Sequence, residues 1–155
     1  MSDVDLLQSK LGLPGAPVVL AGLTTVAYFF RTVIQQDPMN WWQYLRGIDF
    51  HKPVTVRTLA RGTKLVRFDT LGDRPPKPKP FVYFTRPGTS PFSLGTSFAQ
   101  SEFKLFETDR PTPALESIAS GLSFSPTDRV SRLGGGIQFI VASRDAPTLV
   151  RAGKP

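Results

Sequence analysis

Prolines and glycines divide this chain into short segments. Its 155 residues include fifteen prolines and thirteen glycines, and both residue types favour turns over long helices and strands. We therefore expect more sheet and loop than helix. The sequence contains no cysteine, so it offers no disulfide framework, no thiolate zinc site and no cysteine nucleophile. The fold must be held together by packing alone.

The first 50 residues differ from the rest and predict a helical extension. Their apolar spacing favours a short helix near residues 4–10 and a longer one over 18–36. Asp37 ends the second helix, because a residue that precedes proline is pushed out of the helical region. The aromatic residues at 41, 42 and 44 predict a helical turn that packs this extension onto the following domain. We expect a helical extension over 1–50 and a separate domain over 51–155.

The segment 17–30 is the one candidate for a membrane helix. It is shorter than the ~20 apolar residues that a span needs, and Thr24, Thr25 and Tyr28 interrupt it. A buried helix is the favoured interpretation, and an interfacial or partner-docking helix is the alternative. The start of the chain is acidic, unlike a secretory signal peptide, so we expect no such signal.

Beyond residue 53 the pattern changes to short β-prone runs. These runs predict strands at 54–59, 65–68, 81–85, 103–106, 137–142 and 148–151. The stretch 112–120 instead predicts a helix, with Thr112 as N-cap, Pro113 at its first position and Gly121 beyond its end. The lysine- and proline-rich stretch 72–80 predicts a charged surface loop, or else a lid over an anionic ligand. The expected fold class is α+β, a split and mostly antiparallel sheet with N-terminal helices.

The charge of the chain limits its partners without selecting one. The formal net charge is +7, and the first 50 residues contain three basic and four acidic side chains, so the excess lies in the remainder. A basic surface favours nucleic acid, a diphosphate ligand or an acidic protein. His51 is the only histidine, which argues against a histidine-based nucleophile relay and against metal catalysis. The glycines at 134–136 precede a strand, whereas the common phosphate-binding loops open a helix.

Six polar residues lie on or beside the predicted strands: Arg61, Arg67, Tyr83, Thr85, Ser90 and Gln138. Most belong to three segments, namely Leu-Val-Arg-Phe at 65–68, an aromatic strand with a Pro-Gly-Thr-Ser-Pro-Phe turn ending at Phe92, and Gly-Gly-Gly-Ile-Gln-Phe at 134–139. Each segment alone also fits a purely structural interpretation. The glycines then form a loop or bulge, Gln138 is an exposed strand residue, the arginines are solvated charges, and Ser90 ends a turn.

In this order and at these separations, the three segments resemble NAD-degrading toxins related to ADP-ribosyltransferases, above all the tuberculosis-necrotizing-toxin-like group. The similarity is greater still to small NADase effectors of type VI secretion. It spans about 58–151 and leaves the helical extension outside. The resemblance implies an ADP-ribosyltransferase-like sheet and a toxin domain over 51–155. It also implies hydrolysis of NAD⁺, and of NADP⁺, at the nicotinamide–ribose bond, which releases nicotinamide and ADP-ribose.

The resemblance also implies roles for individual residues. Gln138 matches the glutamine that replaces the catalytic glutamate of protein-modifying ADP-ribosyltransferases. Arg67 matches a strand arginine that holds a phosphate or ribose, and Arg61 competes with it for that role. Tyr83 matches the aromatic residue that lines the nicotinamide–ribose pocket. The other predicted contacts to the dinucleotide are Thr85, Ser90, Phe92 and Gly136.

The chemistry of NAD⁺ agrees with these residue types. Nicotinamide leaves as a neutral ring, so no strong general acid is needed, and the ribose gains positive charge in an oxocarbenium-like transition state. Arginine suits the diphosphate through paired, charge-assisted hydrogen bonds. Gln138 is neutral and cannot be a base, but it can fix a ribose hydroxyl or a water molecule. No carboxylate stands beside it in the sequence, which favours water over a protein side chain as acceptor.

Two other functions stay open. An ADP-ribosyltransferase that modifies a macromolecule would use the same residues, and a nucleic-acid-directed toxin would use the basic charge but lacks a histidine pair and an RNA-binding motif. We expect NAD⁺ or NADP⁺ as substrate, no further cofactor, no metal and no nucleic acid. A cytosolic NADase would poison its producer, so we expect a tight-binding cognate immunity protein. We also expect the N-terminal helices to contact secretion machinery or a chaperone, and delivery into the cytoplasm of target bacteria.

Overall fold

The computed structural model describes residues 2–70, 79–89, 101–120 and 135–153. Its helices are α1 (Asp3–Leu11), α2 (Pro17–Phe29) and α3 (Trp42–Leu45), with a π-helical turn at Phe30–Ile34 and 3₁₀ turns at Pro38–Trp41 and Ser143–Asp145. The strands are β1 (Thr55–Leu59), β2 (Lys64–Thr70), β3 (Phe81–Thr85), β4 (Ser101–Glu107), β5 (Thr112–Ile118), β6 (Ile137–Ala142) and β7 (Thr148–Gly153). The two predicted N-terminal helices and all six predicted strands are confirmed.

The described strands form one antiparallel sheet in the order β1-β5-β6-β3-β2-β4-β7. Each of its neighbouring pairs is antiparallel. The sheet is weakest between β2 and β3, where Val66 and Thr85 are the only residues in register. The predicted α+β class, with an antiparallel sheet and N-terminal helices, is confirmed.

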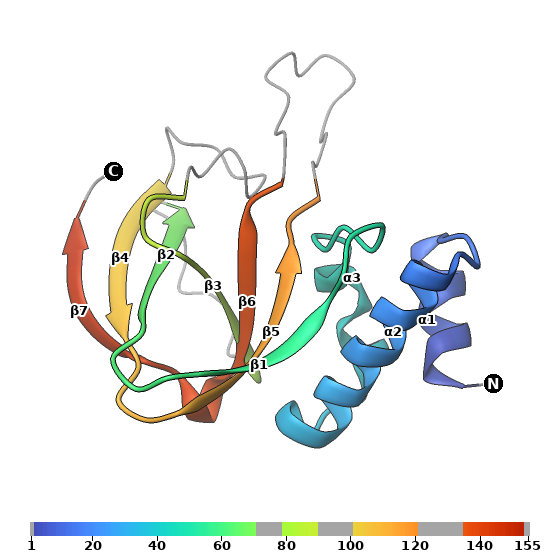
Figure 1. The fold of residues 1–155 in the computed structure, drawn as a ribbon, viewed down its shortest axis with the longest axis horizontal. Coiled ribbons are helices and arrows are strands. Elements are labelled where there is room, and N and C mark those ends of the chain that lie inside the picture. The colour runs from blue at the N-terminus through green and yellow to red at the C-terminus, as the bar shows by residue number, and fades with distance from the viewer. Residues whose placement is uncertain (1, 71–78, 90–100, 121–134, 154–155) are drawn as a thin grey trace, which may run out of the picture.

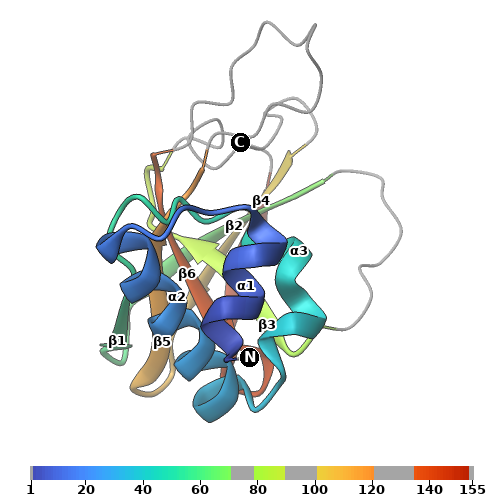
Figure 2. The same ribbon diagram turned by 90° about the vertical axis from the view of Figure 1, so that its right-hand side faces the viewer.

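The helices cover one face of the β1-β5-β6-β3 part of the sheet (Figures 1 and 2). Residues from both sides form a first core cluster, in which α2 and its π-helical turn contribute side chains that are 0% exposed: Val19, Leu23, Val26, Phe29 and Phe30. The strands contribute Phe81, Leu115, Ile140 and Ala142. Arg144, which follows β6, donates to the backbone carbonyls of Val33 and Ile34 at the end of the π-helical turn. The helical extension and the sheet thus share a core.

The predicted burial of the apolar helix is confirmed by this packing. The run Pro17–Ile34 is also long and apolar enough to cross a membrane by length and composition. The core helix of a folded domain has the same length and composition. The fully buried residues of α2 and its π-helical turn pack against strand residues, which is what a core helix does.

A second core cluster lies on the other face of the sheet. It contains Leu59, Leu65, Phe84, Ala114, Phe139 and Val141, with Phe106 packed against it. The rings of Phe84 and Phe106 meet edge to face with their centroids 5.1 Å apart. The cluster takes side chains from the β1-β5-β6-β3 part of the sheet and from the β2-β4-β7 part. It therefore joins the two parts across the β2–β3 pair, where their hydrogen bonding is weakest.

The helix predicted at 112–120 is wrong, because these residues form strand β5. β5 lies between β1 and β6 and is buried on both faces, so it lacks the polar–apolar alternation that marks a strand with one solvated face. Pro113 pairs with Thr58 of β1 beyond the end of the β6 ladder, where a missing N–H is tolerated. The hydroxyl of Thr112 donates to the Arg110 carbonyl instead of capping a helix.

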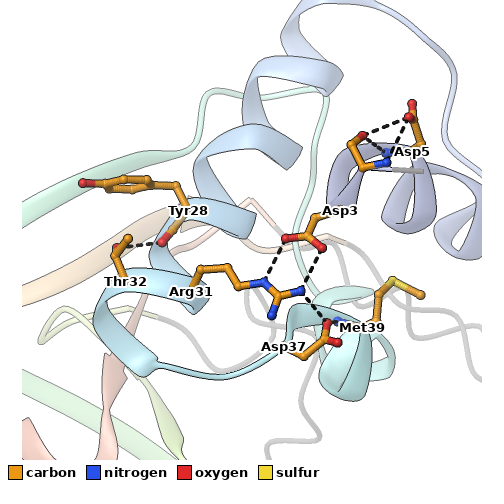
Figure 3. Close-up of polar contacts among 8 residues, drawn as sticks. Asp3, Asp5, Tyr28, Arg31, Thr32, Asp37 and Met39 are labelled. Atoms are coloured by element: carbon orange, nitrogen blue, oxygen red, sulfur yellow. Dashed lines mark hydrogen bonds and ion pairs between the residues drawn. The ribbon is translucent and has the colours of Figure 1, made fainter.

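Arg31, in the π-helical turn that continues α2, forms an ion pair with Asp3 at the start of α1 (Figure 3). Its guanidinium donates two parallel hydrogen bonds of 3.0 Å to the carboxylate of Asp3. It also lies 3.4 Å from a carboxylate oxygen of Asp37. Asp37 caps the 3₁₀ turn Pro38–Trp41, where its side chain accepts from the Met39 amide. One cation therefore joins three chain segments at the surface.

Replacing Asp3 with asparagine is expected to lower the melting temperature slightly at neutral pH and not at all in strong acid. The hydrogen bond from Arg31 holds the pKa of Asp3 below its ordinary value of 3.8. A carboxyl group with a lowered folded-state pKa stabilises the fold above its unfolded pKa, and this contribution is lost as the pH falls through the folded pKa. Thermal melts of both proteins at about pH 7 and pH 2 measure the difference. An equal difference at both pH values would contradict this assignment, and added salt should reduce the difference at neutral pH.

Candidate functional site

Gln138 lies between Thr85 and Ser117 on three neighbouring strands. It is in register with Thr85 of β3 and with Ser117 of β5, and it is 7% exposed. Its side-chain nitrogen donates to the Ser117 hydroxyl at 3.2 Å and to the Gly47 carbonyl at 3.1 Å. A carboxamide nitrogen has two hydrogens, so these bonds engage both and leave Oε1 as the atom that can act on a ligand.

The segment that follows α3 is bonded to the end of β5 beside Gln138. The Gly47 carbonyl also accepts from the Ser120 amide at 2.9 Å, and the Asp49 amide donates to the Ile118 carbonyl at 2.8 Å. The predicted contact residue Gly136 is bonded to the same end of β5, because its carbonyl accepts from the Ala119 amide at 2.9 Å. The surroundings of Gln138 are therefore built by the helical extension as well as by the sheet.

Tyr83 lies on the same face of β3 as Thr85, two residues earlier, and packs against the first core cluster. Its hydroxyl donates to the Tyr44 carbonyl at 2.9 Å, and its ring meets that of Phe81 edge to face at 5.9 Å. Burial raises the pKa of Tyr83 above its ordinary value, so the phenol stays protonated and acts as a donor. The structure gives Tyr83 a bond that holds the helical extension on the sheet.

Arg67 projects from the opposite face of the sheet to Gln138. It pairs with Lys104 of β4 and lies two residues after Leu65, which belongs to the second core cluster. Side chains two apart on a strand share a face, so half-buried Arg67 points toward that cluster. Gln138 instead contacts Gly47 on the helix side. A ligand that contacts both Arg67 and Gln138 would have to pass from one face of the sheet to the other around the ends of the strands.

Arg61 lies in the turn between β1 and β2 and is exposed. It lines an open pocket of about 410 Å³ together with Glu107, Thr108 and Asp109. None of the other predicted site residues that the structure describes lines this pocket. Of the two competing arginines, Arg67 is the one whose strand contacts β3, through the Val66–Thr85 pair.

Two predicted contact residues, Ser90 and Phe92, lie outside the described residues, as does Gly134 and most of the loop predicted at 72–80. Within the part of the chain that the structure describes, no three His, Asp or Glu side chains gather where they could hold a metal ion.

Some polar residues that surround the predicted site are not recognisable from the sequence. Ser117 and Glu116 fall in the stretch that was predicted to be a helix, so their cross-strand partners could not be recognised. Arg86 lies between the aromatic strand and its Pro-Gly-Thr turn, and the motif gave no role to this position. It directly follows Thr85, whose pairing with Gln138 is a strand register that the sequence does not reveal.

Comparison with known proteins adds three findings. The family model described as Bacterial toxin 46 matches residues 19–145. The chain is 32% identical over 111 residues to the NAD(P)(+) glycohydrolase toxin Tse6 of Pseudomonas aeruginosa, an alignment that covers 67% of this chain and 24% of that protein. The chain thus spans about a quarter of the length of this curated relative. The fold is also similar to that in the structure of Tse6 in complex with Tsi6, with a TM-score of 0.68 and 22% identity, covering 88% of this chain and 98% of that chain.

The family match begins within α2. It therefore includes most of α2 and the aromatic turn, so the family extends beyond the predicted span of about 58–151. The boundary at residue 50 stays a prediction.

Proposed function

This chain belongs to the Bacterial toxin 46 family, and we propose that it hydrolyses NAD⁺ at the nicotinamide–ribose bond, releasing nicotinamide and ADP-ribose. The observation that carries this proposal is the 32% identity to a protein named as an NAD(P)(+) glycohydrolase toxin. NADP⁺ is proposed as a second substrate on the same ground. The ADP-ribosyltransferase-like character of the sheet is part of the proposal.

In the proposed reaction Gln138 acts through its side-chain oxygen. The bond between the ribose carbon and the nicotinamide nitrogen breaks, the electron pair leaves with the neutral ring, and water attacks the ribose carbon and releases a proton to solvent. Since Ser117 and Gly47 hold the nitrogen of Gln138, Oε1 is left to accept a hydrogen bond from a ribose hydroxyl or from the attacking water. A fixed acceptor of this kind favours the positive charge that develops on the ribose.

The placement of Glu116 supports water as the acceptor. Its partner in the register is Phe139 rather than Gln138, so its carboxylate projects from the other face of the sheet. There it forms ion pairs with Arg57 and Arg86. A transferase benefits from a carboxylate near the reacting carbon that can activate its acceptor, and Glu116 does not hold that position.

Purified protein is expected to consume NAD⁺ and to release nicotinamide and ADP-ribose in equal amounts without any added macromolecule. Chromatography of the products over time measures all three species. Transfer of adenine-labelled ADP-ribose to protein or nucleic acid would indicate an ADP-ribosyltransferase instead. Intact NAD⁺ together with salt-dependent RNA binding would indicate a nucleic-acid-directed toxin and would reject the proposal.

We also propose a cognate protein partner that blocks the activity. The related toxin Tse6 was solved in complex with Tsi6, and the formal charge of +7 favours an acidic partner. Delivery by type VI secretion into the cytoplasm of target bacteria, with the N-terminal helices contacting machinery or a chaperone, stays a proposal. Growth of bacteria that produce the chain with and without a candidate partner would measure the protection.

A further inference from the structure

Two arginines share one carboxylate on the face of the sheet that carries the second core cluster. Glu116 accepts from Arg57 at 2.8 Å with one oxygen and from Arg86 at 3.3 Å with the other. The side chain of Glu116 is 15% exposed, whereas both arginine side chains are 57% exposed. Two positive charges face one negative charge, so the cluster retains a net positive charge that solvent can reach.

Arg86 is held by its surroundings more completely than an ordinary surface arginine. Its guanidinium carbon lies 5.6 Å from the centroid of the Phe139 ring, and stacking on an aromatic ring fixes the plane of a guanidinium. A guanidinium has five N–H donors in that plane, and the bond to Glu116 engages one of them. The remaining N–H donors of Arg86 therefore have a fixed orientation in which they can bind an anion.

The backbone of Arg86 lies next to that of Gln138, and its side chain projects from the opposite face of the sheet, against Phe139; Arg57 lies farther from Gln138. Thr85 is in register with Gln138, and Arg86 follows it, so the α-carbons of Arg86 and Gln138 lie within roughly 7 Å of each other by ordinary strand geometry. A turn fixes this end of β3, with the Thr89 amide donating to the Arg86 carbonyl at 3.2 Å. Arg57 lies on the edge strand β1, which β5 separates from β6.

We infer that Arg86 binds the diphosphate of the dinucleotide substrate and that Glu116 positions it, an inference that rests on the proposed function. Two parallel N–H donors match two phosphate oxygens. Arg67 projects from the same face, beside the same core cluster. Gly135 and Gly136 precede β6, and a Cβ at Gly135 would meet no heavy atom within 4 Å, so this strand end permits close approach of a ligand that extends toward Gln138.

The chain contains a matched pair of variants for the test. Arg86→Ala and Arg57→Ala remove the same side chain, with the same exposure and the same ion-pair partner, but only Arg86 adjoins the site. Arg86→Ala is expected to raise the KM for NAD⁺ and the inhibition constant of inorganic pyrophosphate by about tenfold or more, as expected for a lost charge-assisted hydrogen bond, and to change kcat less. Arg57→Ala removes a charge of the same cluster but not the donors that face the site, so it is expected to change either constant several-fold less than Arg86→Ala does.

Two further variants separate binding from positioning. Arg86→Lys keeps the charge but loses the paired donors, so its KM should fall between those of wild type and Arg86→Ala. Glu116→Gln should also raise KM, with little change in kcat, because the guanidinium loses its fixed orientation. Thermal melts of all variants check that the fold is retained. A KM for Glu116→Gln equal to that of wild type would remove its positioning role.

Calorimetric titration with pyrophosphate separates failure of this inference from failure of the proposed function. If wild type hydrolyses NAD⁺ but the two alanine variants share one KM and one pyrophosphate affinity, the role of Arg86 is rejected and the NADase stands. If wild type leaves NAD⁺ intact but binds pyrophosphate through Arg86, the anion site stands and the NADase is rejected. Absence of pyrophosphate binding by wild type would overturn the inference.

Discussion

Replacement of Gln138 with alanine is expected to lower kcat for nicotinamide release by about 100-fold or more, the usual effect of removing one preorganised polar group from an active site. The expected loss falls on kcat rather than on KM, because the acceptor bond from Oε1 is needed most when positive charge develops on the ribose. Steady-state kinetics of the purified variant at saturating NAD⁺ measures this effect.

Gln138 also has a structural role, and the experiment must separate the two. Its loss removes the bonds to Ser117 and Gly47, which should cost on the order of 1–2 kcal/mol of folding free energy. Gly47 keeps the bond from the Ser120 amide, so the variant should still fold. Denaturant unfolding of the variant gives the actual cost.

Ser117→Ala is the matched control. It removes one hydrogen-bond partner of Gln138 but leaves the glutamine and its side-chain oxygen. If Gln138 acts on the substrate, Ser117→Ala should lose part of the same stability, since it removes one of the two bonds, but keep far more activity than Gln138→Ala. A folded Gln138→Ala protein with kcat within about threefold of wild type would confine Gln138 to its structural role, since a lost transition-state contact costs more than that.

Local signals predicted most of the fold. The run 81–85 matches β3, because an aromatic strand between a proline and a Pro-Gly turn has few alternatives. The π-helical turn that continues α2 ends at Ile34, because Gln35 adopts a left-handed conformation with φ of 64°; the restriction before proline predicted an end two residues later. The sequence predicted a helix in place of β5 for two reasons. Its neighbours bury β5 on both faces, so its pattern does not alternate. The segment also begins with threonine and proline and contains residues that favour helices.

The candidate site could be predicted only in part, because register is a long-range property. Sequence motifs placed Gln138 and Thr85 on separate strands, and pairing brought them together. The bond from Gln138 to Gly47 joins residues 91 positions apart, and no local pattern predicts it. The same register places Arg67 on the face opposite Gln138, which spacing along the chain could not reveal.

Replacement of Phe81 with alanine is expected to destabilise the helical extension and the sheet together by ~3–5 kcal/mol, the usual cost of removing a buried phenylalanine ring. Phe81 is 0% exposed and belongs to the core cluster that the helices and the sheet share. Its ring meets those of Phe30 and Trp41 edge to face at 5.4 and 5.5 Å. Such a loss is a large share of the ~5–15 kcal/mol that stabilises a typical domain.

Phe84→Ala makes this a test of whether 1–50 and 51–155 fold as one unit. Phe84 lies on the same strand and is 3% exposed, but it belongs to the second core cluster, whose described members are all strand residues. The two tryptophans, Trp41 and Trp42, both lie in the helical extension, so their fluorescence reports on that part while far-UV circular dichroism reports on the whole chain. Because the first core cluster joins both parts, each variant should shift both unfolding transitions equally, and only Phe81→Ala should change the native emission. A Phe84→Ala protein whose dichroism transition shifts while its fluorescence transition stays in place would instead establish two independently folding units.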